Sequence, residues 1–154
     1  MAQMSPTSNR VTSPQPSPLG AALERVGDRW SLLVIEALLD GPRRYNDLLD
    51  ALPGIAPNIL ADRLRRLESG GLIVSRPYSK RPPRMDYSLA ADGRDLAGAL
   101  RLLADWGARR ATPAGEPHEP LRHEACGTPL EARWYCPTCG LTVADEEAPA
   151  TRFV

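Results

Sequence analysis

The stretch that decides the fold is GPRRYNDLLDALPGIAPNILADRLRRLESGGLIVSRPYSKRPPRMDYSL, residues 41–89. Leucines recur at helical spacing over residues 45–52, which predicts a short amphipathic helix. Gly54 and Pro57 then bracket a turn, and proline suits the first position of a helix because its missing N–H would have no partner there. A second helix is therefore expected over residues 58–68.

The second helix has two contrasting faces. Leu60, Leu64 and Leu67 share one stripe, which we expect to face the core. The opposite face carries Asn58, Ala61, Asp62, Arg65 and Arg66. Asparagine and arginine can each make two hydrogen bonds to a base edge in the major groove of DNA, and a small alanine permits close approach. The alternative is that this face is an ordinary solvent-exposed basic face of a helix with no role in DNA binding.

The residues after this helix favour the DNA interpretation. Strands are expected over residues 72–78 and 85–89, and the tip between them, residues 79–84, is too rich in proline for regular pairing. Residues 43–84 contain nine Lys and Arg against four Asp and Glu, a net charge of +5, whereas the whole chain is neutral. Such a patch attracts phosphate. The order predicts an α+β winged helix-turn-helix, with candidate DNA contacts at Arg43, Arg44, Asn58, Ala61, Asp62, Arg65, Arg66, Lys80, Arg81 and Arg84.

The chain resembles the HxlR-type family of bacterial transcriptional regulators. The resemblance covers residues 18–107 and rests on Trp30, GPRRY, RLRRLE, GLI, PPRMDYSL and a closing DWG. It implies an obligate homodimer that binds pseudo-palindromic operators in double-stranded DNA, with recognition helices in successive major grooves and wings on the flanking minor grooves. It implies no catalysis.

Two positions depart from the family pattern. Many relatives have a cysteine thirteen residues before the tryptophan, which some use to sense oxidants, but Ser17 stands there in this chain. Thiol sensing at that position is therefore excluded. Relatives also commonly place Ser or Thr before the proline of the recognition helix, where this chain has Ala56. The lost cap should cost roughly 0.5–2 kcal/mol if nothing compensates.

Composition and periodicity suggest how the rest of the chain is organised. We expect a disordered tail over 1–16, the DNA-binding and dimerisation domain over 17–110, a linker over 111–121, a zinc-ribbon-like segment over 122–147 and a C-terminal tail over 148–154. Further helices are expected over 18–25, 30–39 and 91–110. The apolar stripe of the last, a long dimerisation helix, is wider than a small winged domain needs, and a dimer contact would use the surplus. Trp30 and Trp106 fit core or interface packing better than ligand binding.

All three cysteines lie after the linker. Two short turns, His123-x2-Cys126 and Cys136-x2-Cys139, each end in glycine and follow the spacing of a zinc ribbon. Four protein ligands would close the coordination sphere, so the zinc would be structural. The alternative is a redox pair at Cys136 and Cys139 with Cys126 unrelated, although the βαβ setting of such pairs is missing. His118 lacks the spacing for a ligand.

The sequence favours a non-enzymatic regulator and leaves two rivals. The zinc-ribbon-like segment could sense metal or oxidants, or the winged domain could bind a protein instead of DNA. The sequence contains no nucleophile and base pair, no phosphate-binding loop and no open metal site. No apolar run or signal pattern indicates a membrane or export, so a cytoplasmic location is expected. A small-molecule effector remains open.

Overall fold

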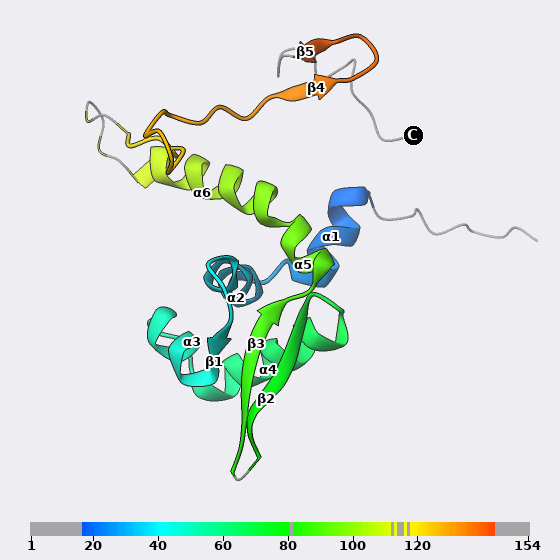
Figure 1. Cartoon of the computed structure of the whole chain (residues 1–154), viewed down its shortest axis with the longest axis vertical. Helices are drawn as coiled ribbons and strands as arrows, with labels where there is room; N and C mark the ends of the chain where they lie inside the picture. Colours follow the sequence, from blue (N-terminus) through cyan, green and yellow to red (C-terminus); the bar gives the residue numbers. More distant parts are fainter. Residues whose placement is uncertain (1–16, 81, 112, 114–115, 117, 144–154) are drawn as a thin grey trace, which may run out of the picture.

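The computed structural model describes residues 17–143, except 81, 112, 114–115 and 117. The N-terminal tail over 1–16, the C-terminal tail over 148–154 and residues 144–147 of the zinc-ribbon-like segment lie outside the described residues. The order of elements, shown in Figure 1, is α1 (Pro18–Val26), α2 (Arg29–Leu39), β1 (Arg43–Arg44), α3 (Tyr45–Ala51), α4 (Pro57–Ser69), β2 (Ile73–Lys80), β3 (Pro83–Leu89), α5 (Ala91–Asp95), α6 (Ala97–Ala111), β4 (Trp134–Cys136) and β5 (Leu141–Val143). The α+β winged helix-turn-helix expected from the sequence is confirmed.

Polar side chains fix where the first two helices begin. The Ser17 hydroxyl accepts a hydrogen bond from the Gly20 N–H at 3.0 Å and caps α1. Asp28 caps α2 by accepting from the Ser31 N–H at 3.0 Å. Each cap satisfies a backbone donor that the helix leaves without a partner. The serine that replaces the family's cysteine therefore has a local structural role.

The hydrophobic core lies between α2, α3, α4 and the base of the sheet. The leucines of the α4 stripe, Leu60, Leu64 and Leu67, are at most 2% exposed, and Leu48 of α3 is fully buried. The inward stripe predicted for the second helix is confirmed. Because burial of a leucine contributes about 1.5–3 kcal/mol, this face fixes which side of α4 points outward.

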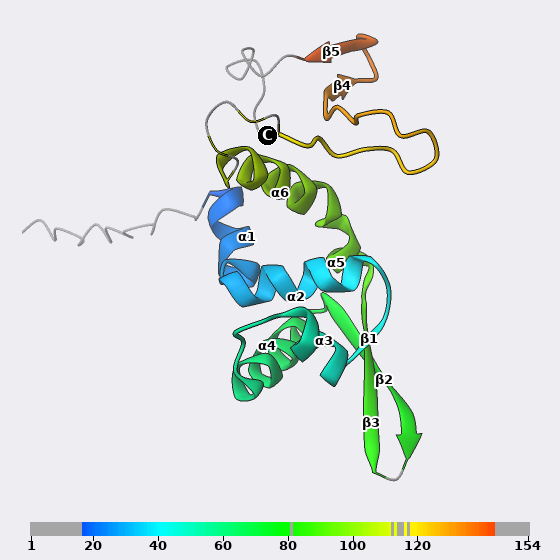
Figure 2. The ribbon, with the colours of Figure 1, turned by 90° about the vertical axis from the view of Figure 1, so that its left-hand side faces the viewer.

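The wing is a twisted antiparallel sheet in the order β1-β3-β2. Figure 2 shows β2 and β3 projecting well beyond the helices. Residues 79–84 were expected to be too rich in proline for regular pairing, and this prediction was wrong for the described residues at the base of the tip. Ser79 pairs with Arg84 and Lys80 with Pro83, after an irregularity between Pro77 and Ser79. A proline at the first residue of a strand needs no N–H in the ladder, so Pro83 is tolerated.

The single helix expected over residues 91–110 is interrupted at Leu96, so that prediction was also wrong. The short helix α5 is held against the sheet, since the Ala90 N–H donates to the Leu72 carbonyl at 2.9 Å. Gly93 packs so closely there that a Cβ would lie 2.1 Å from the Leu72 oxygen. The following helix, α6, packs instead on α2. Because the helix is interrupted at Leu96, α5 can contact the sheet while α6 contacts α2.

The cysteine-containing segment lies beyond α6, and β4 and β5 pair in a small hairpin (Figure 1). The described part of the linker is attached to α6 through His118, whose Nε2 lies 2.9 Å from Asp105 Oδ1. This hydrogen bond, followed by the charge of Arg109, holds the pKa of the Asp105 carboxyl below its usual value. Among the described residues, no helix is long and apolar enough to cross a membrane.

Candidate nucleic-acid interface

The outward face of α4 is the central feature of the site. Arg65 and Arg66 have side chains that are 75% and 70% exposed, and Asn58 in the first turn is also exposed. Ala61, between them on this face, is half-buried. With Asp62, five of the candidate residues are therefore brought together on one helix, and the small Ala61 lies among them.

Asp62 organises the arginines of this face. Its carboxylate lies 3.1 Å from Arg66 Nε, 3.5 Å from an Arg65 nitrogen and 3.0 Å from an Arg63 nitrogen. Exposed ion pairs contribute only about 0–1 kcal/mol, so Arg65 and Arg66 can exchange Asp62 for a phosphate or a base at small cost. In this structure the Asp62 carboxylate is thus paired with arginines of its own helix.

Arg63 belongs to the scaffold. Its Nε lies 2.9 Å from Asp28 Oδ1, and its side chain is only 18% exposed. Burial acts to raise the pKa of Asp28, but the hydrogen bonds from Ser31 and the charge of Arg63 outweigh it and lower that pKa. The ion pair ties α4 to the start of α2 and fixes the rotation of the outward face.

The beginning of α4 is held by α3. No side chain caps the helix at Ala56, as the sequence predicts. The Tyr45 hydroxyl donates a hydrogen bond to the Pro57 carbonyl at 2.6 Å. This bond, which sequence reasoning missed, joins the two helices across the turn and sets the position of the first turn of α4.

The base of the wing is fixed to the end of α4. Glu68 accepts hydrogen bonds from the N–H of Ser75, at 3.3 Å, and from its hydroxyl. Tyr87 is the cross-strand partner of Ser75, and burial, together with the charge of Glu68, raises the pKa of its phenol. The orientation of β2 and β3 relative to α4 is therefore supported by the Glu68–Ser75 hydrogen bonds beside the half-buried Tyr87.

The basic residues of the wing have different environments. Arg84 is exposed, Arg81 lies outside the described residues, and for Lys80 the structure describes the backbone position in β2. The Arg44 guanidinium lies 4.3 Å from the centre of the Tyr78 ring and 3.6 Å from Asp86. Since this side chain is 58% exposed, it provides a positive charge between α3 and the wing.

Arg43 is directed away from this surface. Its Nε donates a hydrogen bond to the Ala37 carbonyl at 2.6 Å, and another nitrogen lies 3.4 Å from Asp40. Both partners belong to the end of α2, where positive charge is favourable near the last carbonyl groups. The structure therefore separates Arg43 from the other candidate DNA contacts and makes it a connection between β1 and α2.

The candidate zinc ligands form two separate pairs. His123 Nδ1 lies 3.3 Å from Cys126 Sγ, and the Gly127 N–H closes the turn by donating to the His123 carbonyl at 2.7 Å. In the second turn, the Gly140 N–H donates to the Cys136 carbonyl at 2.9 Å. Within the described residues, no three His, Cys, Asp or Glu side chains are close enough together to hold a metal ion.

The glycines that end these turns have the backbone conformation expected of such turns. Gly127 and Gly140 have φ of +69° and +68°, a region that other residues adopt at a cost. The donor set fits zinc chemically, and each turn has its pair of donors, but the two pairs are not assembled. Hydrogen bonding by Thr128 lowers the pKa of the Cys126 thiol, and hydrogen bonding by Cys139 and Thr138 lowers that of Cys136.

Comparisons with known proteins agree with this geometry. Residues 25–114 match the family described as HxlR-like helix-turn-helix. An uncharacterized HTH-type transcriptional regulator of Mycobacterium tuberculosis is 40% identical over 122 residues, which cover 79% of this chain and 77% of that protein.

Solved structures are similar as well. The crystal structure of the protein PA1607 is 30% identical, with a TM-score of 0.73, over 96% of this chain and 99% of the other. The redox regulator HypR in its reduced form is 30% identical, with a TM-score of 0.58, over 61% of this chain and 93% of the other. The similarity to PA1607 extends into the cysteine-containing segment. The similarity to HypR covers a length that corresponds to the winged domain alone.

Proposed function

The chain belongs to the HxlR-like helix-turn-helix family of transcriptional regulators, and from this premise we propose that it binds a pseudo-palindromic operator as a homodimer. The observation that carries the proposal is the outward face of α4, where Arg65 and Arg66 stand exposed beside a basic wing. Each α4 would enter a major groove, and each wing would lie along a flanking minor groove.

The two parts of this surface have different tasks. Arg65 and Asn58 have the side chains that can distinguish bases by paired hydrogen bonds, and the half-buried Ala61 leaves room for the groove edge. Arg44, Arg66, Lys80, Arg81 and Arg84 supply positive charge for phosphates. Phosphate contacts fix the register of the protein on the duplex, while base contacts select its sequence.

The dimer is proposed to form through α6 and α1. Leu102, Leu103 and Trp106 on α6 are 48%, 52% and 53% exposed, and Leu19 and Leu23 on α1 are 67% and 52% exposed. An apolar surface of this kind is typical of an interaction site. A second copy is the occupant that a two-fold symmetric operator requires. In this proposal residues 17–110 are the DNA-binding and dimerisation domain.

The segment over residues 122–147 is proposed to bind a structural zinc ion through His123, Cys126, Cys136 and Cys139, with the linker over 111–121 before it. The support is the donor chemistry and the two glycine-ended turns, each with its pair of ligands. Binding would bring the two pairs together and order the segment, since a metal site is rarely formed in advance of its metal. Zinc would cross-link the two turns and would not take part in a reaction.

A second candidate role for this segment is regulatory. The Cys126 and Cys139 side chains are exposed, and hydrogen bonding favours the thiolate forms of Cys126 and Cys136, which react faster with oxidants. The similar protein HypR is named a redox regulator. Reversible loss of operator binding on chelation or mild oxidation would identify the segment as a sensor. Operator binding that does not change on chelation or oxidation would indicate that the segment is structural.

Selection of bound duplexes from a random pool tests the main proposal. We expect enrichment of a two-fold symmetric motif, and we expect Arg65→Ala to relax base choice at one position per half-site by about 1–3 kcal/mol. Arg133→Ala is the matched control, because Arg133 is a 63% exposed arginine in the cysteine-containing segment. A pool without enrichment would contradict sequence-specific binding, and an Arg65→Ala preference equal to that of the wild type would remove Arg65 from the base contacts.

A further inference from the structure

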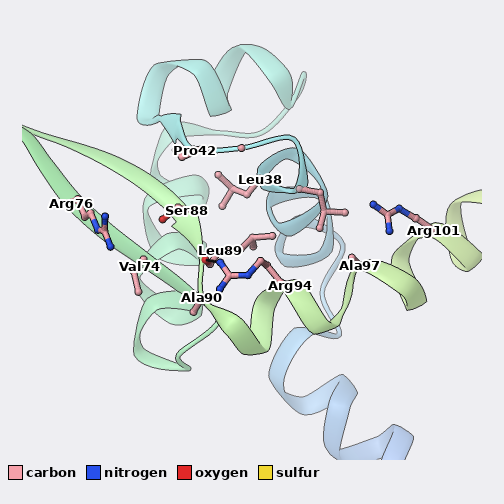
Figure 3. Close-up of a pocket in the computed structure, with 12 residues that line it drawn as sticks. Leu38, Pro42, Val74, Arg76, Ser88, Leu89, Ala90, Arg94, Ala97 and Arg101 are labelled. Carbon is pink, nitrogen blue, oxygen red and sulfur yellow. Dashed lines mark hydrogen bonds between the residues drawn. The ribbon is translucent and has the colours of Figure 1, made fainter. Parts of the chain in front are cut away.

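We propose that a groove between the base of the wing and the α5–α6 junction binds a small organic anion with an apolar body. This basic groove is lined by residues of α2, the following loop, β2, β3, α5 and α6. Its volume is about 550 Å³, within the range of small-molecule sites. Figure 3 shows its lining residues converging from elements far apart in the sequence.

The apolar part of the basic groove comes from leucines and a valine. Leu38 and Leu39 at the end of α2, Val74 on β2 and Leu89 at the end of β3 line it. Leu38 and Leu89 are buried, whereas Val74 remains 39% exposed. A ligand with an aromatic or aliphatic body could cover Val74 and gain from that contact.

The charged residues that line the basic groove are all positive. Arg76, Arg94 and Arg101 line it, and no Asp or Glu does. The Arg94 guanidinium donates to the Leu89 carbonyl at 2.7 Å, which fixes it at the α5 side. Among the described residues, no hydrogen bond or ion pair engages the guanidinium of Arg76 or Arg101. Both charges are therefore available to an incoming anion.

Neighbouring hollows have a different electrostatic character. The one along α2 that also includes Arg101 contains Glu36 and Asp40, and the one under the linker contains Glu36, Asp105 and Glu119. Arg101 lines all three hollows, but in these two Asp or Glu residues line the hollow together with it. Of these three hollows, the basic groove is the one that no Asp or Glu lines. Its arginines lie beside an apolar wall, and this combination favours an amphipathic anion over a simple inorganic one.

The shape of the site favours a carboxylate ligand. Arginine presents a planar fork of donors that matches a carboxylate, and Arg76 and Arg101 reach the groove from opposite sides in Figure 3. A DNA phosphate would satisfy the charge but would leave Val74 and the leucine wall uncovered. We therefore commit to a free organic carboxylate as the occupant.

Occupancy would have a consequence for regulation. The basic groove includes Val74, Arg76 and Ser88 of the wing together with Ala97 and Arg101 of the proposed dimerisation helix. A ligand that contacts both the wing and α6 would change the preferred angle between the wing and the dimer axis. It would thereby change the spacing of the two α4 helices in the dimer. This consequence rests on the proposed function, whereas the binding site itself does not.

Calorimetric titration of the full chain, without DNA, tests the site. The probes are naphthalene-2-carboxylate and its neutral analogue 2-naphthalenemethanol. We expect one carboxylate per chain, bound about ten- to a hundred-fold more tightly than the alcohol, as expected for charge-assisted hydrogen bonds. Arg76→Gln/Arg101→Gln should remove most of this preference. Arg84→Gln should not, because Arg84 is an exposed arginine of the same hairpin outside the groove.

A second variant tests the site by adding a negative charge to the groove. Ser88→Asp places a carboxylate beside the arginines at the cross-strand partner of Val74 and should weaken naphthalene-2-carboxylate at least about ten-fold by occupying their donors. Circular dichroism would verify that each variant is folded. No binding of the carboxylate, equal binding of the two probes, or equal losses in the Arg84→Gln control and the double variant would each overturn the proposal. None of these results would bear on operator recognition, which the duplex selection tests separately.

Discussion

Leu103→Ala should weaken the proposed dimer without disturbing the winged core. Leu103 is 52% exposed on α6, so about half of its side chain is still available for burial against a partner. Complete burial of a leucine contributes about 1.5–3 kcal/mol. Half of that gives roughly 0.75–1.5 kcal/mol per chain, and two-fold symmetry doubles it to roughly 1.5–3 kcal/mol per dimer.

This free energy corresponds to a dimer dissociation constant raised roughly 10- to 150-fold. Analytical ultracentrifugation over a concentration series would measure it, and thermal unfolding monitored by circular dichroism would verify the fold. Leu130→Ala is the matched control, since Leu130 is 50% exposed but lies in the cysteine-containing segment. A dissociation constant for Leu103→Ala equal to that of the wild type would refute the assignment of α6 to the interface.

Three further predictions concern the wing, the metal and the α2 cap. Lys80→Ala/Arg81→Ala should weaken binding to all duplexes and reduce the salt slope by roughly one unit per lost phosphate contact; an unchanged slope would place the wing off the DNA. Native protein should contain one zinc per chain by elemental analysis, and Cys136→Ser should lose it while duplex affinity stays within a few-fold; zinc-free native protein would contradict the site. Asp28→Ala should reduce stability by about 0.5–2 kcal/mol near neutral pH, and because folding lowers the pKa of Asp28, the wild-type advantage should vanish in urea unfolding as the pH falls below about 4; an advantage that persists in acid would show that the carboxylate charge is not its source.

The sequence predicts well those features that depend on local periodicity. The leucine spacing in α4, the proline at its start and the glycines at its end place the helix within one residue of its observed bounds, Pro57–Ser69. The outward positions of Arg65 and Arg66 follow from the same spacing. Local patterns suffice here because a helix with one apolar stripe has only one way to bury it.

Features that depend on contacts between distant elements could not be predicted. The role of Arg43 is set by the Ala37 carbonyl, and the break at Leu96 follows from α5 packing on the sheet while α6 packs on α2. The basic groove likewise brings Arg76 of β2 and Arg101 of α6 to one hollow. No periodicity relates these residues, so only the packing of the elements reveals their proximity.

Binding of one selected operator and of a scrambled duplex with the same base composition, measured across salt concentrations, tests the central claim most directly. We expect two chains per operator and a preference of at least about 10³-fold over the scrambled duplex at physiological salt. We also expect the affinity of the protein for both duplexes to fall steeply as salt rises, because phosphate contacts contribute to each. Equal affinity for the two duplexes, or one chain bound per operator, would contradict the claim that α4 reads a two-fold symmetric DNA sequence.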